Sequence, residues 1–130
     1  MLDDAYYERF GALALKYRQY NVTDGIADAF VMYCDGEPAA CGCFKRYDAE
    51  SAELKRVFVR KEFRRKHLAT EIVEVCECEA RRQGYHAMVL ETGAEMPEAI
   101  AMYQKLGYAL VENYGDFTGD TACVCMRKQL

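Results

Sequence analysis

The sequence predicts an α/β (α+β) fold in which a single mixed β-sheet is flanked by helices. The first reason is the order of the elements, because helix-like and strand-like segments are interleaved along the chain. The second is an amphipathic helix between two strand-like segments, which makes a crossover between neighbouring parallel strands. The third is size, since 130 residues, 52% of them hydrophobic, suffice for one domain with a buried core. We therefore expect residues 1–130 to form a single domain.

The N-terminal half is expected to contain a helix and a three-stranded meander. Apolar or aromatic side chains recur every three or four residues from Asp3 to about Tyr20, which predicts a helix there. Strands are expected at Ala29–Cys34, Ala39–Tyr47 and Ala52–Arg60. The sequence DGEP at Asp35–Pro38 is a strong turn signal between the first two strands.

Two details of this meander predict special geometry. Gly42 lies among small residues, which indicates that a neighbouring element packs closely against this strand. In the third strand the apolar alternation slips between Leu54 and Val57, where two charged residues are adjacent. One extra residue in a strand is the sequence pattern of a β-bulge, so we expect a bulge at this point.

The C-terminal half is expected to alternate helices and strands. Residues Leu68–Gln83 carry apolar side chains at helical spacing and predict an amphipathic helix. Ala87–Thr92 is an apolar run typical of a buried strand. Pro97–Gly107 has a proline at its first position and a glycine at its end, as helices often do. The last two strands are expected at Tyr108–Tyr114 and Ala122–Lys128.

The charge of the chain is acidic overall but basic at one place. Seventeen basic and 21 acidic residues give a net charge of -4, which argues against nucleic acid as a partner. Seven of the 17 basic residues nevertheless lie in one short stretch: Lys55, Arg56, Arg60, Lys61, Arg64, Arg65 and Lys66. A local positive patch on an acidic protein indicates a small polyanion as the ligand.

This basic stretch lies where a predicted strand leads into a predicted helix. The first turn of a helix leaves backbone N–H groups unpaired at the positive end of its dipole, so the junction is suited to a pyrophosphate. The sequence has no G-x-G-x-x-G and no G-K-[ST], so neither a Rossmann nor a P-loop site is indicated. The alternative is a solvated basic loop without a ligand.

The seven cysteines are expected to be buried small side chains in a reducing cytoplasm. Six of them form C-x-C pairs, no C-x-x-C occurs, and the histidines lie far from the pairs, so a metal site is the less favoured alternative. No signal peptide and no apolar run of about 20 residues is visible, so we expect a cytoplasmic protein without a membrane partner.

Several segments carry a resemblance to a known family: Ala39–Phe44 (AACGCF), Glu53–Arg56 (ELKR), Arg64–Ala69 (RRKHLA), Leu90–Gly93 (LETG), Pro97–Tyr108 (PEAIAMYQKLGY) and Asn113–Gly115 (NYG). With these segments the chain resembles the GNAT superfamily of N-acetyltransferases, and within it a small bacterial subgroup. The family carries an R/Q-x-x-G-x-G/A loop between a bulged strand and a helix. Arg64 and Ala69 match this loop, whereas His67 stands where the family usually has glycine.

Two departures from the family pattern lead to further expectations. At His67 we expect either an ordinary helical conformation or a reduced affinity for the cofactor, and the imidazole could add a donor to a phosphate. Family members usually open with a strand before the first helix, whereas this chain is expected to start within that helix, so the first strand is expected to be absent. The sheet edge left exposed could then be covered by a partner chain in a homodimer.

The resemblance implies that acetyl-CoA lies between two parallel strands, Ala52–Arg60 and Ala87–Thr92, that separate after the bulge. It implies that backbone groups of the first strand bind the pantetheine arm and polarise the thioester carbonyl, and that the basic loop holds the pyrophosphate. The cofactor-binding residues implied are Val57, Phe58, Val59, Arg64, Arg65, Lys66, His67, Leu68, Ala69 and Tyr103.

The resemblance further implies that an acceptor amine attacks the thioester directly. An amine of pKa ~10.4 is protonated at neutral pH, so a base must take its proton. Glu53 is the leading candidate, its alternative role being a surface carboxylate paired with Lys55 or Arg46, and Glu91 is the second candidate. Tyr103 matches the tyrosine that protonates the departing thiolate, its alternative role being core packing.

The acceptor is expected to be a small-molecule or peptide amine. Tyr114, Asp116 and Phe117, in the loop between the last two strands, are expected to line its pocket because of their position. An alternative function is a catalytically weak or inactive module of the same fold that binds or senses acyl-CoA. A third, nucleic-acid binding through the basic loop, is disfavoured by the acidic remainder of the chain.

Overall fold

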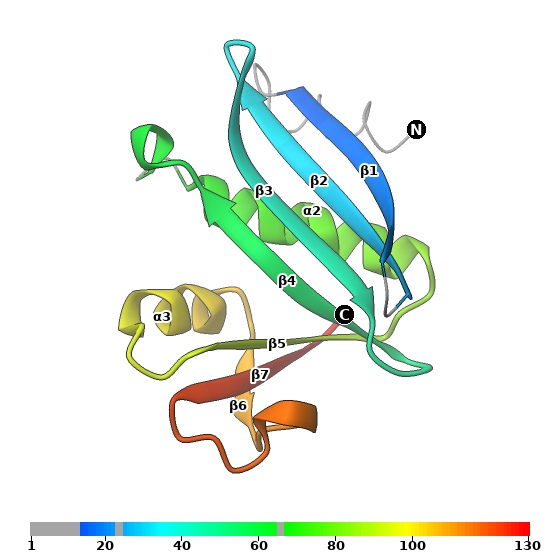
Figure 1. The fold of residues 1–130 in the computed structure, drawn as a ribbon, viewed down its shortest axis with the longest axis vertical. Coiled ribbons are helices and arrows are strands. Elements are labelled where there is room, and N and C mark those ends of the chain that lie inside the picture. Colours follow the sequence, from blue (N-terminus) through cyan, green and yellow to red (C-terminus); the bar gives the residue numbers. More distant parts are fainter. Residues whose placement is uncertain (1–13, 23–24, 65–66) are drawn as a thin grey trace.

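The structure is a computed structural model and describes residues 14–22, 25–64 and 67–130. Within these residues, seven strands form one sheet in the order β1-β2-β3-β4-β5-β7-β6 (Figure 1). The strands are β1 Ala14–Val22, β2 Gly25–Cys34, β3 Glu37–Arg46, β4 Ser51–Val59, β5 Ala87–Gly93, β6 Ala109–Val111 and β7 Cys123–Gln129. Two α-helices, α2 Leu68–Arg82 and α3 Pro97–Lys105, and two short 3-10 helices, η1 Lys61–Phe63 and η2 Gly115–Phe117, complete them.

The predicted mixed sheet flanked by helices is confirmed. Strands β1 to β4 form an antiparallel meander, and α2 then crosses over to place β5 parallel to β4. Strand β7 returns antiparallel to β5 and carries the short edge strand β6. This connection makes β4 and β5 the one neighbouring pair of parallel strands in the described sheet, as the crossover helix predicts.

The N-terminal element differs from the prediction. The described part of the segment Asp3–Tyr20, for which a helix was expected, forms strand β1, and residues 1–13 lie outside the described residues. Strand β1 pairs with β2 from Ala14↔Tyr33 to Val22↔Gly25, so it occupies the sheet edge that an absent first strand would leave open. Local helical spacing is a weak preference, and a long antiparallel pairing outweighs it. Within the described residues, β1 is then the edge strand of the sheet.

Helix α2 packs across one face of β2, β3 and β4 (Figure 1). The side chains of Phe30, Phe44 and Ile72 are at most 1% exposed in this layer, and burial of one such side chain contributes about 1.5–3 kcal/mol. Gly42 makes the close approach possible, because a Cβ atom there would lie 3.2 Å from Cγ1 of Ile72 and 3.5 Å from Sγ of Cys76. The close packing predicted at Gly42 is therefore confirmed.

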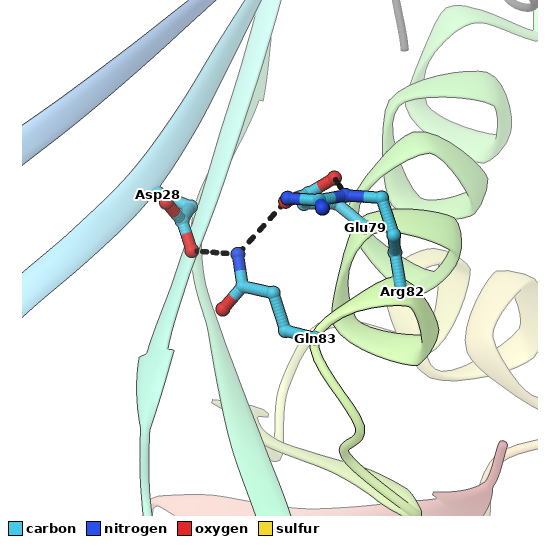
Figure 2. Close-up of polar contacts among 4 residues, drawn as sticks. All are labelled: Asp28, Glu79, Arg82 and Gln83. Carbon is cyan, nitrogen blue, oxygen red and sulfur yellow. Dashed lines mark hydrogen bonds and ion pairs between the residues drawn. The ribbon is translucent and has the colours of Figure 1, made fainter. Parts of the chain in front are cut away.

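Two buried carboxylates of α2, Glu79 near its C-terminal end and Glu77 in its middle, hold the helix against the rest of the molecule. Figure 2 shows the first, where the amide nitrogen of Gln83 donates to Asp28 (2.6 Å) and to Glu79 (2.8 Å). Arg82 donates a second set of hydrogen bonds to Glu79. Burial alone would raise the pKa of Glu79, but the hydrogen bonds from Arg82 and Gln83 outweigh it and lower that pKa.

The second buried carboxylate is Glu77, in the middle of α2. Its two oxygens accept a hydrogen bond from the hydroxyl of Tyr108 (2.8 Å) and one from Nζ of Lys128 (2.9 Å). Glu77 is 2% exposed, so both partners are needed to compensate its removal from water. Through Glu77, α2 is joined to the chain that follows α3 and to β7. The strand predicted at Tyr108–Tyr114 is correspondingly shorter, since Tyr108 points into this cluster instead of extending β6.

Candidate functional site

Strands β4 and β5 run side by side for only a short distance. Their ladder pairs are Ser51↔Ala87, Ala52↔Met88 and Glu53↔Val89. Beyond Glu53 the two strands share no further pair, although β4 continues to Val59 and β5 to Gly93. Figure 1 shows the two strands diverging, with α3 drawn between their separated ends. The divergence that the family resemblance implies for these strands is thus a feature of the structure.

A β-bulge lies in β4 just beyond the point of divergence. Cys43 of β3 opposes Lys55 and Cys41 opposes Phe58, so two steps on β3 correspond to three on β4. The extra residue confirms the predicted bulge, and Arg56 within it adopts a left-handed conformation with φ 56°. A bulge increases local twist and changes the direction in which backbone groups point. Val57, Phe58 and Val59 follow it, in the part of β4 that has left β5.

The C-x-C pair of β3 supports the bulge. The thiol of Cys43 donates to the carbonyl of Lys55 (3.3 Å), and the thiol of Cys41 donates to that of Arg56 (3.6 Å). Burial raises the pKa of both thiols, so they remain protonated donors at neutral pH. Sequence reasoning assigned these cysteines to packing alone, since a C-x-C spacing does not reveal which carbonyls will lie opposite it.

The basic loop begins directly after β4. Nε of Arg64 donates to the carbonyl of Val59 (3.2 Å), and its guanidinium lies 6.0 Å from the ring centre of Phe58. Arg64 is therefore held beside the diverging part of β4. Arg60, in contrast, pairs with Glu62 at 2.8 Å, which neutralises one charge of the basic stretch. The predicted cofactor residues Arg65 and Lys66 lie outside the described residues.

His67 starts α2 in a left-handed conformation, with φ 60° and ψ 21°. The ordinary helical conformation offered as one expectation is therefore wrong, because the residue adopts the backbone geometry that glycine takes freely. For a residue with a β-carbon this geometry costs roughly 1–2 kcal/mol. The side chain of His67 does not cap the helix, and the first-turn N–H groups of Leu68 and Ala69 lie at the positive end of the α2 dipole.

Glu53 is the last residue of β4 that pairs with β5, and it is buried, with 6% of its surface exposed. Its Oε2 accepts a hydrogen bond from the hydroxyl of Tyr114 (2.9 Å), and its Oε1 lies 3.7 Å from Nζ of Lys55. Glu53 is thus a buried carboxylate at the divergence whose ion-pair partner is Lys55 and not Arg46. The long distance to Lys55 leaves Oε1 without a close hydrogen bond from that side chain.

Two aromatic rings pack against the ring of Tyr114, whose hydroxyl donates to Glu53. The ring centre of Tyr114 lies 4.8 Å from that of Tyr47 and 5.9 Å from that of Phe117, both in edge-on geometry. Tyr114 and Phe117, predicted to line the acceptor pocket, therefore lie together near Glu53, whereas Asp116 is exposed on η2. Tyr47 was missed by sequence reasoning, and the only signal for it is an aromatic residue directly before the turn into β4.

Glu91 lies on β5 opposite Cys125 of β7 and is partly buried. Burial raises the pKa of the Cys125 thiol, a backbone hydrogen bond from Tyr114 opposes this rise, and the negative charges of Glu91 and Glu53 add to it. The charges of both candidate carboxylates, one on each diverging strand, thus act on the same thiol. Cys125 is a neighbour of the site that the sequence assigned to packing only.

Tyr103 lies on α3, with its ring 5.5 Å from that of Tyr108 and 8% of its surface exposed. Burial and the nearby Cys76 raise the pKa of its hydroxyl to about 12, so it is protonated throughout the neutral range. Its side chain makes no hydrogen bond to another described residue. Tyr103 thus combines the core packing named as its alternative role with a hydroxyl that has a proton to donate.

Comparison with known proteins assigns the chain to a family. Residues 1–108 match the acetyltransferase (GNAT) family, and the chain belongs to that family. It is 34% identical over 97 residues to the IAA acetyltransferase of Azospirillum brasilense, covering 73% of this chain and 63% of that protein. It is 31% identical over 96 residues to a Bacillus subtilis protein described as the uncharacterized N-acetyltransferase YsnE, covering 72% and 64%. The chain thus spans less than two thirds of the length of these relatives.

Solved structures share the fold. A Klebsiella pneumoniae protein described as an acyl-CoA N-acyltransferase superimposes with a TM-score of 0.78 at 26% identity, covering 98% of this chain and 83% of that one. A GNAT family acetyltransferase from Elizabethkingia anophelis, solved with acetyl-CoA bound, has a TM-score of 0.77 at 12% identity, covering 92% and 99%. At that identity the second likeness concerns the fold. In the described part of this chain, no helix is long and apolar enough to cross a membrane.

Proposed function

We propose that this chain is an acetyl-CoA-dependent N-acetyltransferase that passes the acetyl group to a primary amine by direct attack on the thioester. The observation that carries the proposal is the divergence of β4 and β5 after Glu53, next to a bulge and to the start of α2. Family membership supports it, since relatives of this chain are named as N-acetyltransferases. Free thiols at all seven cysteines fit the cytoplasm as its location.

The residues at the divergence fit acetyl-CoA in their chemistry. Backbone groups of Val57, Phe58 and Val59 would hold the pantetheine arm and orient the thioester carbonyl, because fixed N–H groups need no reorganisation when charge develops. Arg64 and the first-turn N–H groups of α2 would hold the pyrophosphate, and the left-handed His67 keeps the backbone in the geometry of the family's glycine. Acetyl-CoA supplies the acetyl carbon as an activated thioester.

The carboxylates of the site handle the proton of the acceptor. Glu53 takes the proton of the incoming ammonium group in our proposal, and Glu91 is the second candidate for this role. Both lie where β4 and β5 part, and the burial of Glu53 keeps bulk water from competing for it. The neutral amine then attacks the acetyl carbon.

Tyr103 stabilises the departing thiolate. Its pKa of about 12 compares with ~8.5 for an ordinary thiol, so complete proton transfer would be uphill by about 5 kcal/mol. We therefore assign to Tyr103 a hydrogen bond to the negative sulfur as charge develops, since full proton transfer is downhill only to a thiolate that is more basic than the tyrosinate itself. The acceptor is a small-molecule or peptide amine.

The experiment that tests this function combines binding and turnover. Thermal unfolding is measured with acetyl-CoA at 100-fold over its Kd, where one site should stabilise the fold by about 2.7 kcal/mol. A panel of primary amines is then assayed by release of free thiol. Stabilisation without turnover of any amine would favour the acyl-CoA-binding module instead. Absence of stabilisation by acetyl-CoA and by CoA would contradict the site itself.

A further inference from the structure

We infer that Tyr114 is a positioning residue for acetyl transfer, whose hydroxyl holds the Glu53 carboxylate in the orientation from which it accepts the proton of the acceptor. This inference rests on the proposed function, in which Glu53 is the base. It assigns a role to Tyr114 that lining a pocket does not require. The role is exerted through Glu53 and not on the reacting atoms.

The contact brings together segments that are far apart along the chain. Glu53 lies on β4, whereas Tyr114 lies in the loop between β6 and η2, 61 positions later. The Tyr114 hydroxyl donates to Oε2 of Glu53 at 2.9 Å, a normal length for a hydrogen bond to a carboxylate. A contact between a buried carboxylate and a single hydroxyl at the divergence of β4 and β5 is too specific to follow from general packing of a loop.

The hydrogen bond leaves one oxygen of Glu53 available. Oε2 is engaged by Tyr114, while Oε1 has Lys55 at 3.7 Å, beyond hydrogen-bond distance. A carboxylate with one oxygen fixed and the other less constrained can accept a proton in a defined direction. A glutamate side chain without such a contact would sample several rotamers, and the productive one would be populated only part of the time.

Tyr114 is itself held rigidly. Its ring is packed edge-on between Tyr47 and Phe117. The neighbouring Asn113 pins the loop, because its side-chain amide donates to the carbonyls of Asp120 (2.8 Å) and Cys123 (3.2 Å). The position of the hydroxyl is therefore set by the protein before any acceptor arrives, which is what a positioning residue requires.

The protonation state of Tyr114 suits a permanent donor. Burial, and after it the hydrogen bond to Glu53, raises the pKa of the Tyr114 hydroxyl well above its ordinary value. The hydroxyl therefore keeps its proton throughout the neutral pH range. Tyr114 orients the carboxylate and does not exchange protons with it.

The test is a double-mutant cycle between Tyr114→Phe and Glu53→Gln, read as kcat, as KM for the amine and as Kd for acetyl-CoA. We expect Tyr114→Phe to lower kcat about 10-fold, equivalent to about 1.4 kcal/mol, with both KM and Kd within about two-fold. In the Glu53→Gln background the same substitution should change kcat by less than about two-fold, because there is no longer a base to orient.

Tyr108→Phe is the matched control. It removes a tyrosine–glutamate hydrogen bond of similar length, to Glu77, which lies on α2 and outside the site. This variant should lower the melting temperature with a much smaller effect on kcat. If Tyr114→Phe proves too unstable, Tyr47→Ala is the second variant, because Tyr47 is 42% exposed and its ring packs against that of Tyr114. Removing this ring should loosen Tyr114 and lower kcat several-fold at unchanged KM.

Four outcomes would overturn the inference. Equal losses of kcat from Tyr114→Phe with Glu53 or with Gln at position 53 would mean that Tyr114 does not act through Glu53. A raised KM at unchanged kcat would mean that Tyr114 only contacts the acceptor. If the wild type turns over an amine and Tyr114→Phe does so at the same rate, the positioning role alone is refuted. If the wild type turns over no amine, the proposed function is refuted and the positioning role with it.

Discussion

Replacing Tyr103 by phenylalanine removes one hydroxyl from the site and little else. The aromatic ring that packs at 5.5 Å against Tyr108 is retained, and no side-chain hydrogen bond to another described residue is broken. The melting temperature of Tyr103→Phe should therefore stay close to that of the wild type. Any large change in rate can then be attributed to the hydroxyl and not to a rearranged core.

The expected magnitude follows from the role assigned to this hydroxyl. A hydrogen bond to a charged group is worth about 1.5–3 kcal/mol, and this one forms only as the thiolate leaves. Tyr103→Phe should therefore lower kcat by about 10- to 150-fold. Because the starting thioester sulfur carries no charge, the Kd for acetyl-CoA should change by less than about two-fold.

The assay is thiol release at saturating amine, paired with calorimetric titration of acetyl-CoA. Tyr85→Phe is the matched control, since this partly buried tyrosine packs against Phe44 and not at the divergence of β4 and β5. An unchanged kcat in Tyr103→Phe would remove Tyr103 from the mechanism. Parallel losses in Kd and kcat would place it in cofactor binding and refute the argument from developing charge.

Three further predictions concern the loop, the core and alkaline pH. Arg64→Ala should weaken the binding of CoA but not the binding of an analogue that lacks the diphosphate. Arg60→Ala should change CoA binding much less, because Glu62 already neutralises the charge of Arg60. Equal losses of affinity for both ligands in Arg64→Ala would contradict the pyrophosphate assignment. Lys128→Met leaves Glu77 with one partner and should lower the free energy of unfolding, measured in urea, by about 2–4 kcal/mol. Adding Glu77→Gln should recover part of this loss. A loss below about 0.5 kcal/mol would show that Glu77 needs no cation. The raised pKa of Tyr103 contributes folding stability that is fully present below pH 10 and is lost as the pH rises towards 12. By pH 11 the free energy of unfolding of the wild type should therefore fall by about 1.4 kcal/mol more than that of Tyr103→Phe. The same pH dependence of the free energy of unfolding in both proteins would refute the pKa shift.

Both α-helices and strands β2 to β5 and β7 could be predicted because their signals are local. Hydrophobic periodicity, a turn sequence and helix-end residues each fix an element without knowledge of its neighbours. The bulge was predictable for the same reason, since the slip between Leu54 and Val57 is visible in the strand itself. Strand β1 was not, because helical spacing of aromatic residues also occurs in a segment that finds a long antiparallel partner.

The site was predictable only in part, for a related reason. Glu53, Tyr114 and Phe117 were singled out separately, but the hydrogen bond that joins Glu53 to Tyr114 depends on how the loop after β6 folds back over β4. The edge-on contact of Tyr47 with Tyr114 depends on the same loop. The left-handed backbone of His67 is set by the tertiary position of α2 and contradicts the ordinary preference of the residue. Contacts between loops carry no periodic signal from which to infer them.

In the described residues the sheet consists of two parts, here called wings, and the three ladder pairs between β4 and β5 are the only strand pairing that joins them. One wing is the meander with α2, and the other is β5, β7 and β6 with α3. In hydrogen-exchange terms, amides of β5 beyond Val89 and of β4 beyond Glu53 would open with their own wing and not with the other. A ligand that forms hydrogen bonds with the backbones of both strands would connect them beyond their last pair. The amides of the two wings would then be protected from exchange as one cooperative unit.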